Sequence, residues 1–322
     1  MKAIAIEADR LVWQDSPSPD LGTGEVRIAA HATAINRADL VQRSGGYPPP
    51  PGASPILGLE CAGEVIEVGE GVARVAVGDQ VCALLSGGGY AEEVVVPAGQ
   101  VLKIPAGVSM VEAAALPEVF ATAYLNLFME AGLAPGEKAV IHAGASGVGT
   151  AAIQLCRALG NPCFVTLGGQ NKLDACLALG AEAGFNRHEG NFLDSVKAWA
   201  PEGVDVILDP VGAGYLADNL TSLALNGRLV LIGLMGGAAA EINLGLLMMK
   251  RLRIIGSTLR ARPIAAKAAV MDQLQAVVWP KIESGEIRPV VDSVYPISEA
   301  DAAHQHVAAN NTIGKVVLQI VQ

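Results

Sequence analysis

The sequence predicts an α/β protein that combines a β-rich, barrel-like domain with a doubly wound parallel sheet. Three observations support this prediction. Short extended runs separated by turns fill roughly the first 120 residues, strands and helices alternate from residue 138, and a glycine-rich turn follows the first strand of that alternation. With 322 residues, 51% of them hydrophobic and 17% charged, the chain can bury the cores of two domains.

The β-rich part is predicted from short runs rich in valine. The chain opens with a strand-like segment over residues 1–7 that lacks the apolar stretch of a signal peptide. Turn signals such as Gly69-Glu70-Gly71 separate the later extended runs. These runs cover residues 25–33, 63–68, 80–84 and 91–96.

The pattern changes at Ser109, where Ser109 and Glu112 form a predicted capping box at a helix start. Beyond it, strands are expected at 139–142, 163–166, 183–185, 204–209, 228–232 and 253–255, with helices ending near Gly160 and Gly180. Such alternation implies right-handed crossovers and a parallel sheet. A final strand over 314–318 would return to the first domain. We therefore predict one domain from residues 1–120 and 261–322, and a dinucleotide-binding domain over 121–260.

The glycine turn connects the strand at 139–142 to a helix. Gly144 can make a tight turn, while Gly147 and Gly149 remove side chains where a pyrophosphate would approach a helix N-terminus. The match to G-x-G-x-x-G is imperfect because Ser146 replaces the second glycine. A plain glycine-rich turn is the alternative, but the strand–helix units that follow favour a nucleotide site. The candidate cofactor-binding residues here are Gly144, Ala145, Ser146, Gly147 and Val148.

The end of the second strand bears on the choice of cofactor. NAD-binding domains place an acid about 20 residues beyond the glycine turn. Here Gly168 and Gly169 leave room for a 2′-phosphate, and no acid occurs before Asp174. Lys172 and Arg187 could supply positive charge, although each could also be an ordinary surface residue. This segment favours NADPH over NADH.

Charge and cysteine content exclude several classes of function. A formal net charge of −10 disfavours nucleic-acid and anionic-membrane partners, and no apolar run approaches the about 18 residues of a transmembrane helix. The 5 cysteines include no C-x-x-C pair, which argues against a structural zinc site and for a reducing cytoplasm. His31 and His142 fall in expected strands and are interpreted as core or edge residues.

Motifs along nearly the whole chain resemble those of the medium-chain dehydrogenase/reductase superfamily, and in particular its zinc-free quinone oxidoreductase (zeta-crystallin-like) branch. They are Ala34-Ile35-Asn36-Arg37-Ala38-Asp39, Tyr47-Pro48-Pro49-Pro50-Pro51-Gly52, Leu57-Gly58-Leu59-Glu60-Cys61-Ala62-Gly63, Val77-Gly78-Asp79, residues 143–149 with Gln154, Gly233-Leu234-Met235-Gly236-Gly237 and Ile313-Gly314-Lys315.

The resemblance implies a GroES-like barrel with a Rossmann domain, bound NADPH, a small-molecule substrate and a homodimer. By matching motifs, Asn36 and Tyr47 should line the substrate side. Thr122 and the Leu234-Met235-Gly236 turn should flank the nicotinamide, and Lys172 matches the lysine that binds the 2′-phosphate. Two positions depart from the family: Gly169 replaces a frequent serine and Arg187 a frequent tyrosine, so the strength of the NADPH preference stays open.

No metal is expected. Zinc-dependent relatives have a cysteine where this chain has Asn36 and a histidine where it has Leu59. Cys61 is expected to pack rather than to ligate, and Glu60 to be a buried structural carboxylate.

The predicted function is zinc-independent, NADPH-dependent reduction of quinones, by hydride or single-electron transfer. Asn36 and Tyr47 could donate hydrogen bonds to the acceptor oxygen, although either could be purely structural. Two alternatives remain: a reductase of other activated alkenes (enals, enones or enoyl thioesters), and a catalytically idle NADPH-binding sensor or RNA-binding protein. The role of Arg260 and Arg262 is open.

Overall fold

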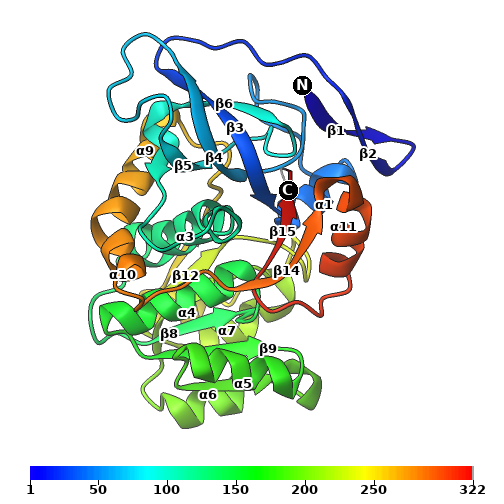
Figure 1. Ribbon diagram of the computed structural model, residues 1–322. Coiled ribbons are helices and arrows are strands. Elements are labelled where there is room, and N and C mark those ends of the chain that lie inside the picture. Colours follow the sequence, from blue (N-terminus) through cyan, green and yellow to red (C-terminus); the bar gives the residue numbers. More distant parts are fainter. Residues whose placement is uncertain (321–322) are drawn as a thin grey trace. The chain divides into compact units, whose positions relative to one another are not determined.

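The computed structural model describes residues 1–320 and divides them into two compact units (Figure 1). The first unit comprises Met1–Ala121 and the tail from Leu259 onward, and the second comprises Thr122–Thr258. The predicted fold class, a GroES-like domain with a Rossmann-type parallel sheet, is confirmed.

The first unit is built around a seven-stranded sheet with the order β14-β15-β3-β4-β5-β7 and with β6 also paired to β3. Strand β3 is paired with several other strands of this sheet: its first half pairs with β6, and its last residues pair with β15. The strands are β3 (Glu25–Ala34), β4 (Glu60–Val68), β5 (Gln80–Leu84), β6 (Glu93–Pro97), β7 (Val101–Lys103), β14 (Val291–Pro296) and β15 (Lys315–Gln319). The tail therefore completes the sheet of the first unit.

Smaller elements cover this sheet. A separate hairpin joins β1 (Lys2–Glu7) and β2 (Arg10–Asp15). The helices are α1 (Arg37–Arg43), α2 (Met110–Ala113), α9 (Ile264–Gln273), α10 (Trp279–Glu283) and α11 (Ala300–Ala308), with α3 (Pro117–Tyr124) crossing into the second unit. The capping box at Ser109 is present: its hydroxyl accepts from the Glu112 N–H, and the Glu112 carboxylate accepts from the Ser109 N–H.

The second unit contains six parallel strands in the order β10-β9-β8-β11-β12-β13. This order reverses at β8, and in open α/β sheets ligands bind at such a switch point. The strands are β8 (Ala139–His142), β9 (Cys163–Leu167), β10 (Ala183–Asn186), β11 (Val204–Asp209), β12 (Leu223–Leu231) and β13 (Arg253–Gly256).

Helices connect these strands in the manner of a doubly wound sheet. They are α4 (Gly147–Leu159), α5 (Gln170–Leu179), α6 (Leu193–Trp199), α7 (Leu216–Ser222) and α8 (Leu244–Met249). Helix α4 packs against α5, and α6 packs against α7 (Figure 1). Gly160 and Gly180 end α4 and α5 in the left-handed conformation that glycine adopts without steric cost.

Strand β12 begins at Leu223, five residues before the predicted start at Arg228. Among the extra residues, Leu223 pairs with Val204, and the register then shifts so that the next pair is Val206 with Arg228, an irregularity that a regular strand pattern does not reveal. Among the described residues, no helix is both long and apolar enough to span a membrane.

Candidate functional site

The glycine turn lies between β8 and α4. Ala143 is in the left-handed region with φ of 54°, and the Gly144 N–H donates to the Thr166 carbonyl at 3.0 Å. Ser146, which breaks the glycine fingerprint, is the N-cap of α4, and its hydroxyl accepts from the Gly149 N–H at 3.0 Å. A serine here satisfies one of the free donors of the helix start.

The residues of this turn fit a phosphate group. A Cβ on Gly149 would lie 2.4 Å from the Gly144 carbonyl oxygen, and one on Gly144 would lie 2.7 Å from Val165 Cβ, so neither position tolerates a side chain. The N–H groups of Gly147 and Val148 begin the 13-residue helix α4 and have no acceptor within it. These donors and the helix dipole favour an anion at this end.

The second predicted feature, the turn after β9, is flanked by basic side chains. A Cβ on Gly168 would lie 3.2 Å from Arg187 Nε and 2.9 Å from His188 Nε2. Gly169 has φ of 104°, and its N–H donates to Asn186 Oδ1 at 3.0 Å. Lys172 is half-buried in the first turn of α5. The structure thus brings Arg187 to this turn and adds His188, which sequence reasoning missed.

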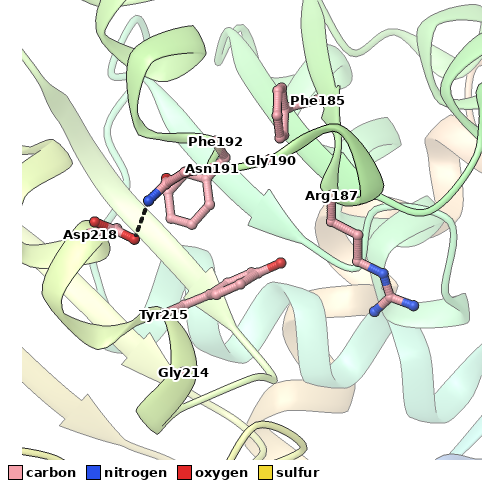
Figure 2. Close-up of a pocket in the computed structure, with 8 residues that line it drawn as sticks. All are labelled: Phe185, Arg187, Gly190, Asn191, Phe192, Gly214, Tyr215 and Asp218. Carbon is pink, nitrogen blue, oxygen red and sulfur yellow. Dashed lines mark hydrogen bonds between the residues drawn. The ribbon is translucent and has the colours of Figure 1, made fainter.

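A pocket of about 200 Å³ opens beside Arg187 (Figure 2). Its aromatic walls are Phe185, Phe192 and Tyr215, and Figure 2 shows the Tyr215 hydroxyl and the Arg187 guanidinium extending toward the same side. Burial raises the pKa of Tyr215, while Arg187 acts to lower it. The pocket therefore joins flat apolar surfaces to a positive charge.

A chain of buried hydrogen bonds connects the carboxyl ends of the central strands. His142 Nδ1 lies 2.8 Å from Thr166 Oγ1, and its Nε2 lies 2.7 Å from Asn219 Oδ1. Asn219 Nδ2 donates to Asp209 at 3.0 Å, and Asp209 also accepts from the Val211 N–H at 2.6 Å. Burial lowers the pKa of His142 to about 4, so His142 is a neutral core residue at neutral pH, as expected.

The turn after β12 is held against the turn after β11. The N–H groups of Met235 and Gly236 donate to the carbonyls of Pro210 and Val211 at 3.2 and 2.7 Å. Leu234 and Met235 are left exposed, and a Cβ on Gly236 would lie 2.7 Å from a Val211 methyl group. This turn therefore presents apolar side chains from a fixed backbone.

Thr122, the remaining predicted residue of the second unit, is buried near the end of α3. Its carbonyl accepts from Asn126 Nδ2 at 2.7 Å.

In the first unit, Asn36 belongs to a buried ionic network. Asn36 Oδ1 accepts from Lys315 Nζ at 2.7 Å, and Asn36 Nδ2 donates to Glu60 Oε1 at 2.9 Å and to the Ala34 carbonyl at 3.3 Å. Lys315 Nζ also lies 2.7 Å from Glu60 Oε1. Both amide hydrogens of Asn36 thus have partners within its own unit. Lys315 belongs to one of the family motifs, but the sequence assigned it no role.

Tyr47, the second candidate on the substrate side, stacks beneath a guanidinium group. The Arg260 Cζ atom lies 5.2 Å from the centre of the Tyr47 ring, and Arg260 Nη1 donates to the Tyr47 carbonyl at 3.2 Å. Burial, followed by the charge of Glu118, raises the pKa of Tyr47. Its phenol is therefore protonated at neutral pH and can donate a hydrogen bond.

Leu59, which stands where zinc-dependent relatives have a metal ligand, and the neighbouring Cys61 are buried and apolar in character. Cys61 is buried in the core of the first unit, and burial raises the pKa of its thiol to about 12. Leu59 is also buried. Across residues 1–320, no three histidine, cysteine or acidic side chains are grouped so that they could hold a metal ion.

Comparison with known proteins agrees with this architecture. Residues 22–106 match the alcohol dehydrogenase GroES-like domain family, and residues 147–276 match the zinc-binding dehydrogenase family. The chain is 32% identical to rat quinone oxidoreductase, with 94% of this chain and 90% of that protein covered. It is also 32% identical to the human synaptic vesicle membrane protein VAT-1 homolog, with 96% and 83% covered.

Among solved structures, the quinone oxidoreductase of Thermus thermophilus, studied also in complex with NADPH, superposes with a TM-score of 0.83 at 35% identity. The match covers 99% of this chain and all of that one. The two units and the glycine turn define the class of oxidoreductases that use a nicotinamide dinucleotide. The chain belongs to the medium-chain dehydrogenase/reductase superfamily, in its quinone oxidoreductase branch.

Proposed function

We propose that this protein is a zinc-independent, NADPH-dependent oxidoreductase that reduces quinones. The observation that carries the proposal is the pairing of a glycine turn at the start of α4 with a second turn flanked by Arg187 and His188. NADPH is distinguished from NADH by its 2′-phosphate, which basic side chains favour and an acid would repel.

In this proposal residues 122–258 bind the dinucleotide. The N–H groups of Gly147 and Val148 bind the pyrophosphate, and Arg187, His188 and Lys172 surround the 2′-phosphate. The aromatic pocket beside Arg187 takes the adenine ring, because a flat ring suits its aromatic walls. The exposed Leu234–Gly236 turn and Thr122 flank the nicotinamide, which supplies a hydride when bound.

Residues 1–121 and the tail form the substrate domain in this proposal. Zinc independence is supported by Lys315, whose ammonium lies 2.7 Å from the amide oxygen of Asn36, at the position where zinc-dependent relatives have a ligand. A metal cation placed there would face a buried positive charge. Asn36 lacks a free amide hydrogen, so we assign it a role in shaping the site and assign donation to the Tyr47 hydroxyl.

A conjugated acceptor suits a site of this kind. Hydride addition to a quinone places negative charge on a conjugated oxygen, and a positioned donor then stabilises it without a metal. Other activated alkenes share this chemistry and form the second candidate class. A homodimer and a cytoplasmic location remain predictions, which light scattering and cell fractionation would test.

The test is NADPH oxidation by protein that has been dialysed against a strong chelator. We expect 9,10-phenanthrenequinone to be reduced at an unchanged rate after chelation. Turnover of 2-cyclohexenone but not of the quinone would move the assignment to the second class. Loss of activity on chelation, with recovery on adding zinc, would contradict zinc independence.

A further inference from the structure

Arg260 lies against Tyr47, a second buried cation, Lys267, contacts the Arg260 backbone, and the proposed reaction has not yet used either of them. Arg260 is only 4% exposed and Lys267 only 5%. Arg260 Nε donates to the Ser86 carbonyl at 2.8 Å, and Lys267 Nζ donates to the Ser86 hydroxyl at 2.5 Å. Lys267 also donates to the Arg260 carbonyl at 3.3 Å, so Ser86 and Lys267 hold the segment that carries Arg260.

One end of the Arg260 guanidinium is unsatisfied. Nε and Nη1 have acceptors, but the buried Nη2 has no hydrogen-bond partner among the described residues. Leaving such a donor unpaired is costly, and buried polar groups are nearly always paired. The Nη2 group therefore keeps a charged donor for which the described residues supply no acceptor.

The charges around Nη2 favour an anionic acceptor. Glu118 acts electrostatically on Arg260, Lys267 and Tyr47, and Asp39 acts on Arg260 as well, but neither accepts a hydrogen bond from Nη2. The Arg260 guanidinium therefore keeps a donor that neither carboxylate occupies, and its Cζ atom lies over the Tyr47 ring.

We propose that Arg260 Nη2 and the Tyr47 hydroxyl together form an oxyanion-binding site, which takes the substrate oxygen on which negative charge develops. This inference rests on the proposed function and names the residue that stabilises the product-like anion. As the quinone accepts a hydride at carbon, the electron pair moves to the oxygen that Arg260 binds, and this oxygen then takes up a proton. Loss of the added carbon-bound hydrogen as a proton, with protonation of the second oxygen, completes the hydroquinone. Arg260 is then a catalytic residue, and Lys267 and Ser86 are positioning residues.

The experiment uses 4-nitrocatechol, a coloured analogue of a hydroquinone whose phenolate absorbs in the visible range. Binding to the intact protein, measured without turnover, should shift the bound catechol toward its phenolate form. We expect Arg260→Gln to weaken phenolate binding by about 10- to 100-fold, the effect of a lost charged hydrogen bond. Arg260→Lys keeps the charge and should retain part of the spectral shift.

A matched control removes a different arginine of the same unit. Arg74 pairs with Asp272 and is partly exposed, so Arg74→Gln loses one positive charge and one ion pair without touching Tyr47. It should bind 4-nitrocatechol like the wild type. If Arg260→Gln does not fold, Tyr47→Phe supplies the test, because it should also reduce the phenolate shift.

The outcomes separate this inference from the proposed function. An Arg260-dependent phenolate shift in a protein that does not reduce quinones would support the oxyanion site and refute the quinone assignment. Equal binding by the wild type and both Arg260 variants, or no binding by the wild type, would overturn the oxyanion site whatever the quinone activity.

Discussion

The Lys315 ammonium lies 2.7 Å from the Glu60 carboxylate, and their side chains are only 4% and 0% exposed. Lys315 also donates to the Ile35 carbonyl and to Asn36 Oδ1, while Glu60 Oε2 accepts from the Glu118 N–H at 2.9 Å. Lysine and glutamate are almost never fully buried unless paired. Lys315, the first residue of β15, thus holds Asn36, the N-cap residue of α1, in place.

Removing one partner of this pair should be costly. Lys315→Met leaves Glu60 as an uncompensated buried charge, and we expect a loss of about 3–5 kcal/mol in the free energy of unfolding. Urea denaturation measures it. The double variant Glu60→Gln/Lys315→Met should recover part of the loss, and a single variant as stable as the wild type would show that the pair does not act as described.

The neutral state of His142 predicts a dependence of stability on pH. Its pKa is about 4 in the folded protein against 6.5 in the unfolded chain. The unfolded chain therefore binds more protons below pH 6.5, so the contribution is complete above pH 6.5 and is lost as the pH falls toward 4. The loss amounts to about 3 kcal/mol at most. Denaturation midpoints between pH 4 and 7 measure it.

Other buried groups titrate in the same range. The pKa of His304 is also lowered to about 4 and acts in the same direction. The carboxyl of Asp39, whose pKa is raised to about 6, acts in the opposite direction, since it stabilises the fold as the pH falls. The difference between the wild type and His142→Gln isolates His142. Parallel curves for the two proteins would contradict a neutral, buried imidazole.

The glycine turn predicts a sharp contrast between two alanine substitutions. Gly149→Ala forces a methyl group to within 2.4 Å of the Gly144 carbonyl, so it should displace the start of α4 and weaken NADPH binding at least about tenfold. Gly256→Ala is the control, because a Cβ there meets nothing within 4 Å. Nucleotide fluorescence measures the NADPH affinity of both variants. Equal affinities for Gly149→Ala and Gly256→Ala would contradict a role of the start of α4 in cofactor binding.

Much of the fold could be predicted because the signals are local. The bounds of β5, β8 and β11 agree with the predicted ranges, since each is an apolar run between turn residues. Strands β2, β7 and β14 were not predicted; β7 has only three residues, and β14 alternates half-buried and exposed positions. The capping role of Ser146 shows why the imperfect fingerprint still forms the turn.

The candidate site was less accessible to sequence reasoning because its contacts span long distances along the chain. Lys315 meets Asn36 across 279 positions, and Arg260 meets Tyr47 across 213. No periodicity or spacing encodes such pairs. Arg187 could be singled out as a basic residue near the second turn, but the position of His188 beside Gly168 follows only from the backbone after β10.

The most direct test of the central claim is a titration of the purified protein with NADPH and NADH, followed by nucleotide fluorescence, for the wild type, Lys172→Ala and Arg187→Ala. We predict that the wild type binds NADPH more tightly and that each variant loses about 1–2 kcal/mol of NADPH affinity, with NADH affinity nearly unchanged. Equal affinity of the wild type for the two nucleotides, or equal loss of both in the variants, would contradict NADPH as the cofactor.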